Sequence, residues 1–329
     1  MPERSNLLLR FRRWAIWAIA AGAILYVGGS VWAGLGKTSE ALQSFQWWLY
    51  LPVLALTLVN YSLRFVKWHT LLGRLGVQIP WRDNANLFIA GLAMVISPAK
   101  AGEVLKPYVI SQRTGVSMAT TVPALISERL TDGIAMLALA AISVGTYASD
   151  KVSWVLIPSV LVAAGLAVLA SRRATDFSLS ILARLPFLAR LVPRITELVH
   201  AMRACLEPRT LVAMTALSLV AWWAECLGYW LVLRGVGIEA SLDAATFLYA
   251  FATVAGGAMP GGLGVADGAL AGGAVTILGA PESAAVAAAM LVRVATLWLG
   301  VLMGAFAMLR FESLLHAVEI DDGPADVGL

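Results

Sequence analysis

Two short apolar stretches, each broken by proline and glycine, carry the residue types best suited to bind a ligand inside a membrane. The first reads SPAKAGE over Ser97–Glu103, and the second reads MPGGLGVAD over Met259–Asp267. An arginine follows each break in an apolar segment: Arg129 lies 31 residues after the first proline, and Arg293 lies 33 residues after the second. Paired interruptions in corresponding places of two halves are the best sequence indicator of a transporter's substrate site.

The prolines and glycines of these breaks favour exposed backbone groups at the ends of half-helices. Pro98 and Pro260 cannot donate a backbone hydrogen bond, and glycine permits turns that other residues resist. Broken helices persist at membrane depth only when they are buried in protein or line a water-filled cavity. The half-helix after each break presents free N–H groups, where a phosphate or carboxylate could bind. The alternative is that the glycines merely allow close helix packing; they are Gly102, Gly261, Gly262 and Gly264.

Ionisable residues within apolar segments are the second indication of a site. Glu128, Arg129 and Asp132 form a cluster on one expected helix, on which the two acids share a face. A charge at the centre of a spanning helix costs about 2.5–3.5 kcal/mol on insertion scales, so it faces a partner or a cavity. The cluster is therefore either an internal salt-bridge clamp or part of a substrate site, and both interpretations stay open.

Arg293 has no acid near it in sequence, so its partner must come from elsewhere in the fold. The candidates are Glu103, Glu225, Asp267 or a ligand anion. We favour a binding role for Arg293 and Glu103. Glu225 lies in the middle of an aromatic-rich apolar run, where burial could make it a proton carrier.

Basic residues around the first break allow two interpretations. Lys100, Lys106 and Arg113 could meet an anionic headgroup from the cytoplasmic side, or could be ordinary positive-inside loop charge. The full set of candidate substrate-binding residues is Pro98, Lys100, Gly102, Glu103, Lys106, Glu128, Arg129, Asp132, Glu225, Pro260, Gly261, Gly262, Gly264, Asp267 and Arg293. No Ser/His/Asp set, zinc-ligand spacing or nucleotide-binding loop is recognisable, so we expect no enzyme activity, catalytic residue, metal or cofactor.

The composition indicates the class of fold that positions these residues. Of the 329 residues, 60% are hydrophobic and 13% are charged, and the mean hydropathy is +0.80. A soluble domain has about 45–50% apolar and about 25% charged residues. We therefore expect an all-α integral membrane protein, and the modest net charge of +4 does not indicate nucleic-acid binding.

Six apolar segments are long enough to span a bilayer, which takes about 20 residues. They are Trp14–Ala33, Trp47–Val66, Val116–Ala148, Val152–Ala170, Thr210–Leu233 and Ser283–Leu309. The two broken segments, Ala85–Ile110 and Asp243–Leu278, are expected to form re-entrant helical hairpins. With both hairpins re-entrant, 19 Lys and Arg fall on the cytoplasmic side and three outside, which predicts cytoplasmic N- and C-termini.

This topology predicts one polytopic domain over 1–329 containing an inverted repeat, because span, hairpin and span recur upside down. The expected parts are an N-terminal helix and outer loop (1–46), a first repeat (47–148), a linker helix with a basic cytoplasmic loop (149–209), a second repeat (210–309) and a cytoplasmic tail (310–329). Within the basic loop, amphipathic helices are expected over Leu179–Leu191 and Arg194–Leu206, as a topology anchor or a lipid sensor on the inner surface. The acidic tail after Glu319 is expected to be disordered.

Several of these motifs together resemble the lysylphosphatidylglycerol synthase transmembrane-domain family. The resemblance covers about Trp47–Leu309 and rests on SERLTD at Ser127–Asp132 and PGGLGV at Pro260–Val265, with Arg293 downstream. It implies lipid translocation in a bacterial inner membrane, with Glu103, Glu128, Arg129, Asp132 and Arg293 as functional positions. Asp267 departs from the Glu expected after PGGLGV, and we expect no soluble aminoacyl-transferase domain after Leu309. The synthase activity in the family's name is therefore not carried over.

The sequence thus predicts a flippase for an amphiphilic lipid: a phospholipid, an aminoacyl-phospholipid, a hopanoid or a polyprenyl-linked lipid. Its partners would be membrane lipids, and a polar cavity between the two halves would pass the headgroup. Two alternatives stay open. One is a proton-coupled secondary transporter of a small anion, driven through Glu225. The other is a non-transporting membrane partner of a lipid-modifying enzyme, recruited through the basic loop.

Overall fold

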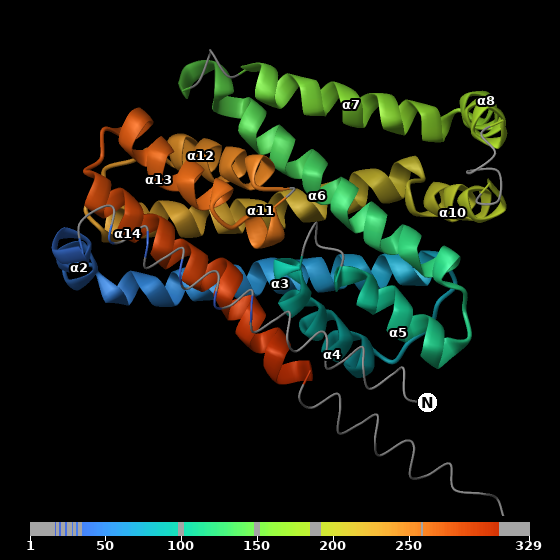
Figure 1. The fold of residues 1–329 in the computed structure, drawn as a ribbon, viewed down its shortest axis with the longest axis horizontal. Coiled ribbons are helices and arrows are strands. Elements are labelled where there is room, and N and C mark those ends of the chain that lie inside the picture. Colours follow the sequence, from blue (N-terminus) through green and yellow to red (C-terminus); the bar gives the residue numbers. More distant parts are fainter. Residues whose placement is uncertain are drawn as a thin grey trace, which may run out of the picture.

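The chain was analysed as a computed structural model that describes residues 35–97, 102–147, 152–184, 192–257 and 259–308, with the single residues 17, 20, 24, 28 and 31. The described residues form helices and no strand, arranged as an elongated bundle (Figure 1). Most of the predicted first span, Pro98, Lys100 and the acidic tail lie outside the described residues.

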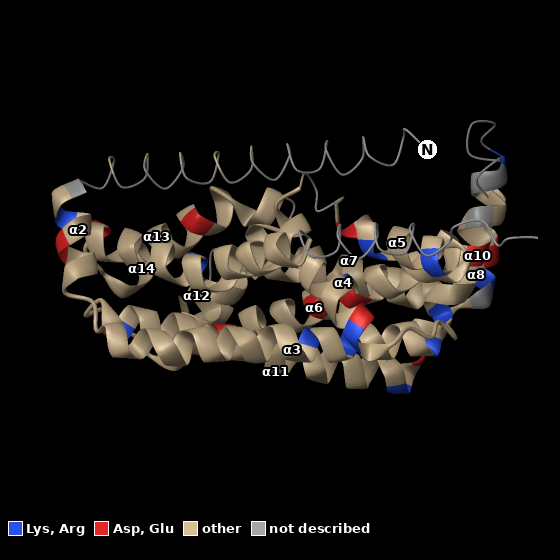
Figure 2. Cartoon of the chain, turned by 90° about the horizontal axis from the view of Figure 1, so that it is seen from below, with Lys and Arg blue, Asp and Glu red and all other residues tan. Residues whose placement is uncertain are grey.

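The bundle is the fold of a multi-pass membrane protein. Four described helices are long and apolar enough to cross a bilayer: Trp47–Arg74, Pro208–Gly235, Pro260–Leu278 and Glu282–Met308. A fifth candidate is a bent pair, Val155–Leu169 with Arg173–Ile181. Large apolar side chains cover the outside, such as Leu302 at 64% exposed, while Glu128 inside is fully buried. Figure 2 shows the long sides of the bundle mostly free of charge, as lipid contact requires.

The first half of the chain folds as helix, broken hairpin, helix. Its first helix is α3 (Tyr50–Arg74), which the short η1 (Trp47–Leu49) precedes. The hairpin consists of α4 (Trp81–Leu92), η2 (Ala93–Ile96) and α5 (Leu105–Thr114), and α6 (Met118–Tyr147) follows it. At 12 residues, α4 rises only about 18 Å, less than the ~30 Å hydrocarbon core. The break expected near Pro98 therefore falls between two half-length helices.

The second half repeats this order of elements. It contains α11 (Pro208–Gly235), then α12 (Leu242–Ala255), η5 (Pro260–Gly262) and α13 (Val265–Leu278) as the hairpin, and α14 (Glu282–Arg293). A π-helical turn, η6 (Val294–Trp298), continues α14 toward Met308. The two arms of the hairpin, α12 and α13, pack against each other. Together, η5 and α13 also reach the length of a span.

The leading helices of the two halves, α3 and α11, lie side by side and run in opposite directions (Figure 1). The backbone N–H of Gln46, before α3, donates to the carbonyl of Gly235 at the end of α11, at 3.0 Å. Further along, Asn60 Nδ2 donates to the carbonyl of Ala221 at 2.9 Å. From the first contact to the second, the residue number rises along α3 and falls along α11, so the two helices are antiparallel.

Both leading helices also end in the same way. Gly76 and Gly237 have φ angles of 72° and 81°, a region that glycine occupies at little cost. Val77 N–H then donates back to Leu72 at 3.1 Å, and Ile238 N–H donates back to Leu233 at 2.9 Å. The same C-terminal turn therefore leads into each hairpin.

The segment between the halves contains α7 (Val152–Ala170), α8 (Arg172–Ala183) and α10 (Val192–Cys205). Helix α7 occupies the predicted range, and α8 is bent by 98° from it. The first amphipathic helix was expected at Leu179–Leu191, but α8 begins earlier, at Arg172, because no proline or glycine interrupts the chain between Arg172 and Leu179. Residues 185–191 lie outside the described residues. An additional helix, α2 (Leu35–Gln43), packs against α14 before η1.

The tips of the two hairpins meet each other inside the bundle. Ile96 on η2 forms a small apolar cluster with Leu297 and Val301 of the last helix. A Cβ added to Gly261 on η5 would lie 3.2 Å from Ile96, so the second tip packs directly on the first. The contact between the tips thus joins the two halves at the positions where each helix is broken.

Candidate functional site

Each hairpin supplies an acid that pairs with the arginine of the helix that follows it. Arg129 Nη2 lies 2.8 Å from Glu103 Oε2, and Arg293 Nε lies 2.9 Å from Asp267 Oδ1. Among the partners considered for Arg293, Asp267 is therefore the acid in contact. The second carboxylate oxygen of Asp267 accepts the backbone N–H of Gly264 at 2.8 Å, which orients the acid at the start of α13.

A network of buried charges joins α3 to α6. Lys67, fully buried, forms an ion pair with Asp132 and donates to Ser218 Oγ at 2.7 Å and to the carbonyl of Glu128 at 3.1 Å. Lys106 Nζ lies 2.9 Å from Glu128 Oε2 and 4.2 Å from the centre of the Trp68 ring. Charges this deep are stable only when they are paired, so this part of the cluster clamps the helices together.

Arg64 extends the network toward the second half. Its guanidinium lies 3.5 Å from Glu128 and 3.7 Å from Asp132, at ion-pair distance from both acids. Its Nε has no hydrogen-bond acceptor among the described residues. Its Cζ also lies 5.5 Å from the centre of the Trp222 ring on α11, a cation–π contact between the halves.

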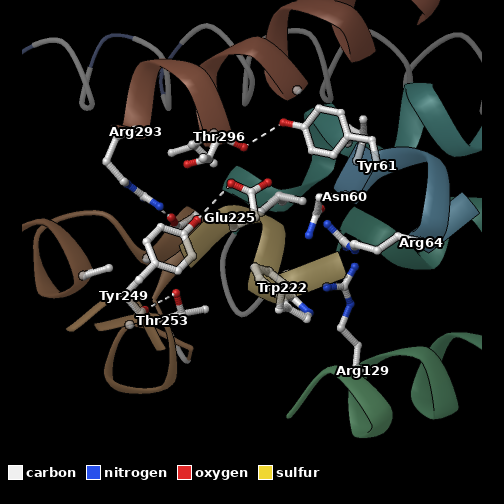
Figure 3. A pocket seen from close by; sticks show the side chains of 18 residues that line it. Asn60, Tyr61, Arg64, Arg129, Trp222, Glu225, Tyr249, Thr253, Arg293 and Thr296 are labelled. Atoms are coloured by element: carbon white, nitrogen blue, oxygen red, sulfur yellow. Dashed lines mark hydrogen bonds between the residues drawn. The ribbon is translucent and has the colours of Figure 1, made fainter. Parts of the chain in front are cut away.

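Beside this network lies a cavity of about 100 Å³. Figure 3 shows that its polar side chains come from both halves: Asn60, Tyr61, Arg64 and Arg129 from the first, and Trp222, Glu225, Tyr249, Thr253, Arg293 and Thr296 from the second. The hairpin tips contribute Val95, Gly261 and Gly262. Each tip is thus part of the cavity wall, as the broken helices predict.

The charges of the cavity wall are unequal. Among the described residues, three arginines and one glutamate line it: Arg64, Arg129, Arg293 and Glu225. The acids that pair with these arginines are Glu103, Glu128, Asp132 and Asp267, and none of them is among the lining residues. The arginines therefore face the cavity with their balancing acids behind them, which favours an anion inside.

Glu225 is the acidic group of the wall. It is 2% exposed, and its Oε2 accepts a hydrogen bond from the hydroxyl of Tyr249 at 3.4 Å. No Lys or Arg among the described residues lies within ion-pair distance of it. Glu225 therefore differs from the four acids of the ion pairs, because it lines the cavity itself and no basic side chain among the described residues pairs with it.

The π-helical turn after Arg293 shapes the far wall. Tyr61 on α3 donates its hydroxyl to the carbonyl of Thr296 within this turn, at 2.7 Å. Wider helical turns of this kind leave backbone carbonyls available and often occur at functional sites. Arg293 also donates to the carbonyl of Gly261, so the turn, the arginine and the second hairpin tip are held together.

The structure divides the predicted site residues into three groups. Those that line the cavity are Arg129, Glu225, Gly261, Gly262 and Arg293. Those outside the lining are Gly102, Glu103, Lys106, Glu128, Asp132, Pro260, Gly264 and Asp267. Pro98 and Lys100 lie outside the described residues. Lys106 does not face a cytoplasmic headgroup, as one interpretation had it, because it is 3% exposed and paired with Glu128.

Sequence reasoning missed Arg64 and Lys67, which it counted as cytoplasmic loop charges with Lys106. All three are buried and paired, so the positive-inside count loses three residues from its larger side. A signal was present: the apolar pattern continues past them through Trp68, Leu71 and Leu72. The predicted span Trp47–Val66 is accordingly too short, and α3 extends to Arg74.

Fold and cavity together define a multi-pass helical membrane protein with a charged internal site between two similarly built halves. Residues 17–304 match the model of the lysylphosphatidylglycerol synthase TM region, and the chain belongs to this family. The resemblance noted in the sequence is thereby confirmed. The chain is also similar to a UPF0104 membrane protein of Methanothermobacter thermautotrophicus, with 25% identity over 308 residues, covering 87% of this chain and 90% of that protein.

Proposed function

We propose that this protein is a flippase that moves a phosphate-bearing amphiphilic lipid across the membrane without making or breaking a covalent bond. The lipid's tails stay in the bilayer while its headgroup passes through the cavity. The observation that carries the proposal is the cavity wall itself, in which Arg129 of the first half and Arg293 of the second line the same cavity. Family membership supports a role connected with membrane lipids.

The two halves act in this proposal as an inverted repeat. Support comes from the antiparallel packing of α3 and α11 and from the matched pairs Glu103–Arg129 and Asp267–Arg293. Inverted repeats allow alternating access, because one half can rock against the other around a fixed site. The contact between Ile96 and Gly261 lies where such rocking would open or close the cavity.

Orientation follows from the distribution of basic residues. In the proposal, the end of the bundle that carries α8 and α10 faces the cytoplasm, in the inner membrane of the cell, and both chain termini lie on that side. Arg203 lies on α10, and Arg74 forms an ion pair with Glu207, which follows α10. Figure 2 shows further Lys and Arg at this end. This distribution is the one that the positive-inside rule expects of a cytoplasmic face.

A proton-coupled transporter of a small anion is the second candidate. The observation that favours it is Glu225, a buried acid in the wall of a cavity that otherwise presents arginines. Such a transporter would accumulate its substrate inside sealed vesicles. A flippase would instead redistribute lipid between the two leaflets and leave the lumen unchanged.

The test uses the purified protein in proteoliposomes that contain fluorescently labelled phosphatidic acid. A membrane-impermeant quencher reports the fraction of labelled lipid in the outer leaflet over time. We expect the protein to speed redistribution, and Arg293→Ala and Arg129→Ala each to slow it at least tenfold, because a headgroup phosphate loses a charged partner.

The matched control is Arg234→Ala, which removes an exposed arginine that stacks on Trp230, outside the cavity lining. This variant should keep the rate of the unaltered protein. Unchanged redistribution by a folded Arg293→Ala protein would overturn the proposal, and uptake of soluble phosphate without lipid movement would favour the second candidate.

A further inference from the structure

We infer that the cavity binds the phosphate group of a lipid phosphomonoester, in which the phosphate is esterified to the lipid alone. The phosphate would lie between Arg64, Arg129 and the indole N–H of Trp222. This inference rests on the proposed function and names the class of its substrate as a lipid phosphomonoester. It assigns Arg64 and Trp222, which the sequence reasoning passed over, as substrate-binding residues.

The first argument is the set of hydrogen-bond donors. Arg64 Nε, Arg129 Nε and Trp222 Nε1 are all buried, and none has an acceptor among the described residues. Figure 3 shows the guanidinium groups of Arg64 and Arg129 facing each other beside the indole of Trp222. Glu128 and Asp132 lie 3.5–3.8 Å from both guanidinium groups, which is longer than a hydrogen bond. A phosphate in the cavity would supply closer acceptors, because its oxygens accept from both arginine and indole donors.

The second argument is that Arg64 is built into its position. It is 6% exposed, and Glu128 and Asp132 lie 3.5 Å and 3.7 Å from its guanidinium. These acids hold Arg64 through contacts to its Nη2 and Nε that are longer than usual hydrogen bonds. The guanidinium group is therefore held at the cavity wall before any ligand arrives, which lowers the entropic cost of binding.

The third argument is size. The cavity has a volume of about 100 Å³ and is open on one side, so it can accommodate a phosphate group while the rest of the lipid lies outside it. The wall also disfavours a cationic headgroup, because it presents three arginines and only one acid, Glu225.

The test measures binding rather than transport. The purified protein in detergent is titrated with short-chain phosphatidic acid, phosphatidylcholine, lysyl-phosphatidylglycerol and inorganic phosphate, with a calorimetric readout. We expect phosphatidic acid to bind at least tenfold more tightly than phosphatidylcholine or lysyl-phosphatidylglycerol. Equal affinities for the three lipids would overturn the inference.

The variants locate the site. Trp222→Phe keeps the ring and removes only the N–H donor, and it should weaken phosphatidic acid binding about tenfold, the loss expected for one hydrogen bond to a charged group. Arg64→Gln should weaken it further. Because Arg64→Gln also removes a cation from buried acids, its melting temperature is measured to check that it folds. If Arg64→Gln misfolds, Trp222→Phe alone tests the site. Arg234→Gln, outside the cavity, should bind as the unaltered protein does. Full affinity in Trp222→Phe and Arg64→Gln would overturn the site.

The titration with inorganic phosphate distinguishes two ligands that carry the same group, a lipid phosphate and free phosphate. Tighter binding of phosphatidic acid assigns the site to a lipid headgroup, and equal binding of inorganic phosphate assigns it to the free anion. The phosphate site stands in both cases. A protein that binds phosphatidic acid but does not flip it refutes the proposed function alone, and one that flips lipids without preferring a phosphomonoester refutes this inference alone.

Discussion

Asp267 pairs with Arg293 across 26 positions of sequence, and Glu103 pairs with Arg129 across the same separation. Each acid lies just after a helix break, and each arginine lies on the helix that follows the hairpin. The spacing is equal although the breaks themselves differ in length and composition. The two halves thus contain the same link between hairpin and helix, although they differ in most residues.

The Asp267–Arg293 pair should be a coupled unit. We expect Asp267→Asn and Arg293→Gln each to lower the melting temperature, and the double variant to be no worse than the more damaging single one. The reason is that a partly buried charge left alone pays its desolvation cost without a partner, and the double variant removes both charges. A differential scanning measurement in detergent gives the three shifts. Additive losses would show that the two residues act independently.

The buried network between α3 and α6 should dominate stability. Lys67→Met removes the cation closest to the Asp132 carboxylate and leaves a buried acid undercompensated, so we expect it to cost about 3–5 kcal/mol. The matched control is Glu207→Gln, which breaks an exposed pair with Arg74 at 3.7 Å, where both side chains are about half exposed. Exposed pairs contribute at most about 1 kcal/mol. Chemical unfolding in mixed micelles compares the two, and similar losses would contradict the assignment of a clamp.

The glycines of the second hairpin tip should matter for packing as well as for backbone conformation. Gly262 and Gly76 share a φ of 72°, so alanine pays about 1–2 kcal/mol of backbone strain at both positions. At Gly262 the new methyl would also lie 3.2 Å from Ala266 and 3.6 Å from Arg293, whereas at Gly76 nothing lies within 4 Å.

Gly262→Ala is therefore expected to lose more stability than Gly76→Ala and to slow lipid redistribution severalfold, while Gly76→Ala keeps the rate. Thermal melting and the proteoliposome assay report the two effects separately. If both variants moved lipid equally fast, the second tip would not belong to the pathway.

Glu225 should oppose the binding of an anion. Replacing it by Gln removes the acid from a wall of three arginines, and in alkaline buffer, where the Glu225 carboxyl is ionised, we expect phosphatidic acid to bind about tenfold more tightly. A unit charge ~10 Å away at an effective dielectric constant of about 20 contributes ~1.5 kcal/mol, which corresponds to this factor. Glu225→Asp keeps the charge and serves as the control. Weaker binding by Glu225→Gln would mean that the carboxylate contacts the ligand favourably.

The breaks and the long helices could be predicted from the sequence because their signals are local. Proline and glycine mark the hairpin tips, and the apolar run of α7 ends at charged or polar residues on both sides. The pairing of charges could not be predicted in this way. Arg64 and Lys67 follow a full-length apolar run, so they resemble the basic end of a span, and only the packing of α6 against α3 supplies their acids.

Only part of the site could be predicted from the sequence, because only some of its residues give a local signal. Arg129, Arg293 and Glu225 are conspicuous because a lone charge in an apolar segment demands a partner or a cavity. Trp222 and Tyr249 are not conspicuous, because aromatic residues are common in membrane helices for unrelated reasons. Their role depends on the antiparallel packing of the halves, which places Trp222 beside Arg64.

The most direct test of the central claim is to block the cavity reversibly while lipid movement is recorded. Thr253 lines the cavity, and the native cysteines Cys205 and Cys226 are buried. A Thr253→Cys protein in proteoliposomes is treated with a charged, water-soluble methanethiosulfonate reagent, which forms a disulfide. The control is Glu239→Cys, at an exposed position in the connection between α11 and α12, outside the lining. We predict that modification of Thr253→Cys stops lipid redistribution, that a reducing agent restores it, and that modification of Glu239→Cys leaves the rate unchanged. Modification of Thr253→Cys with no change in the rate of lipid movement would contradict passage of the headgroup through this cavity.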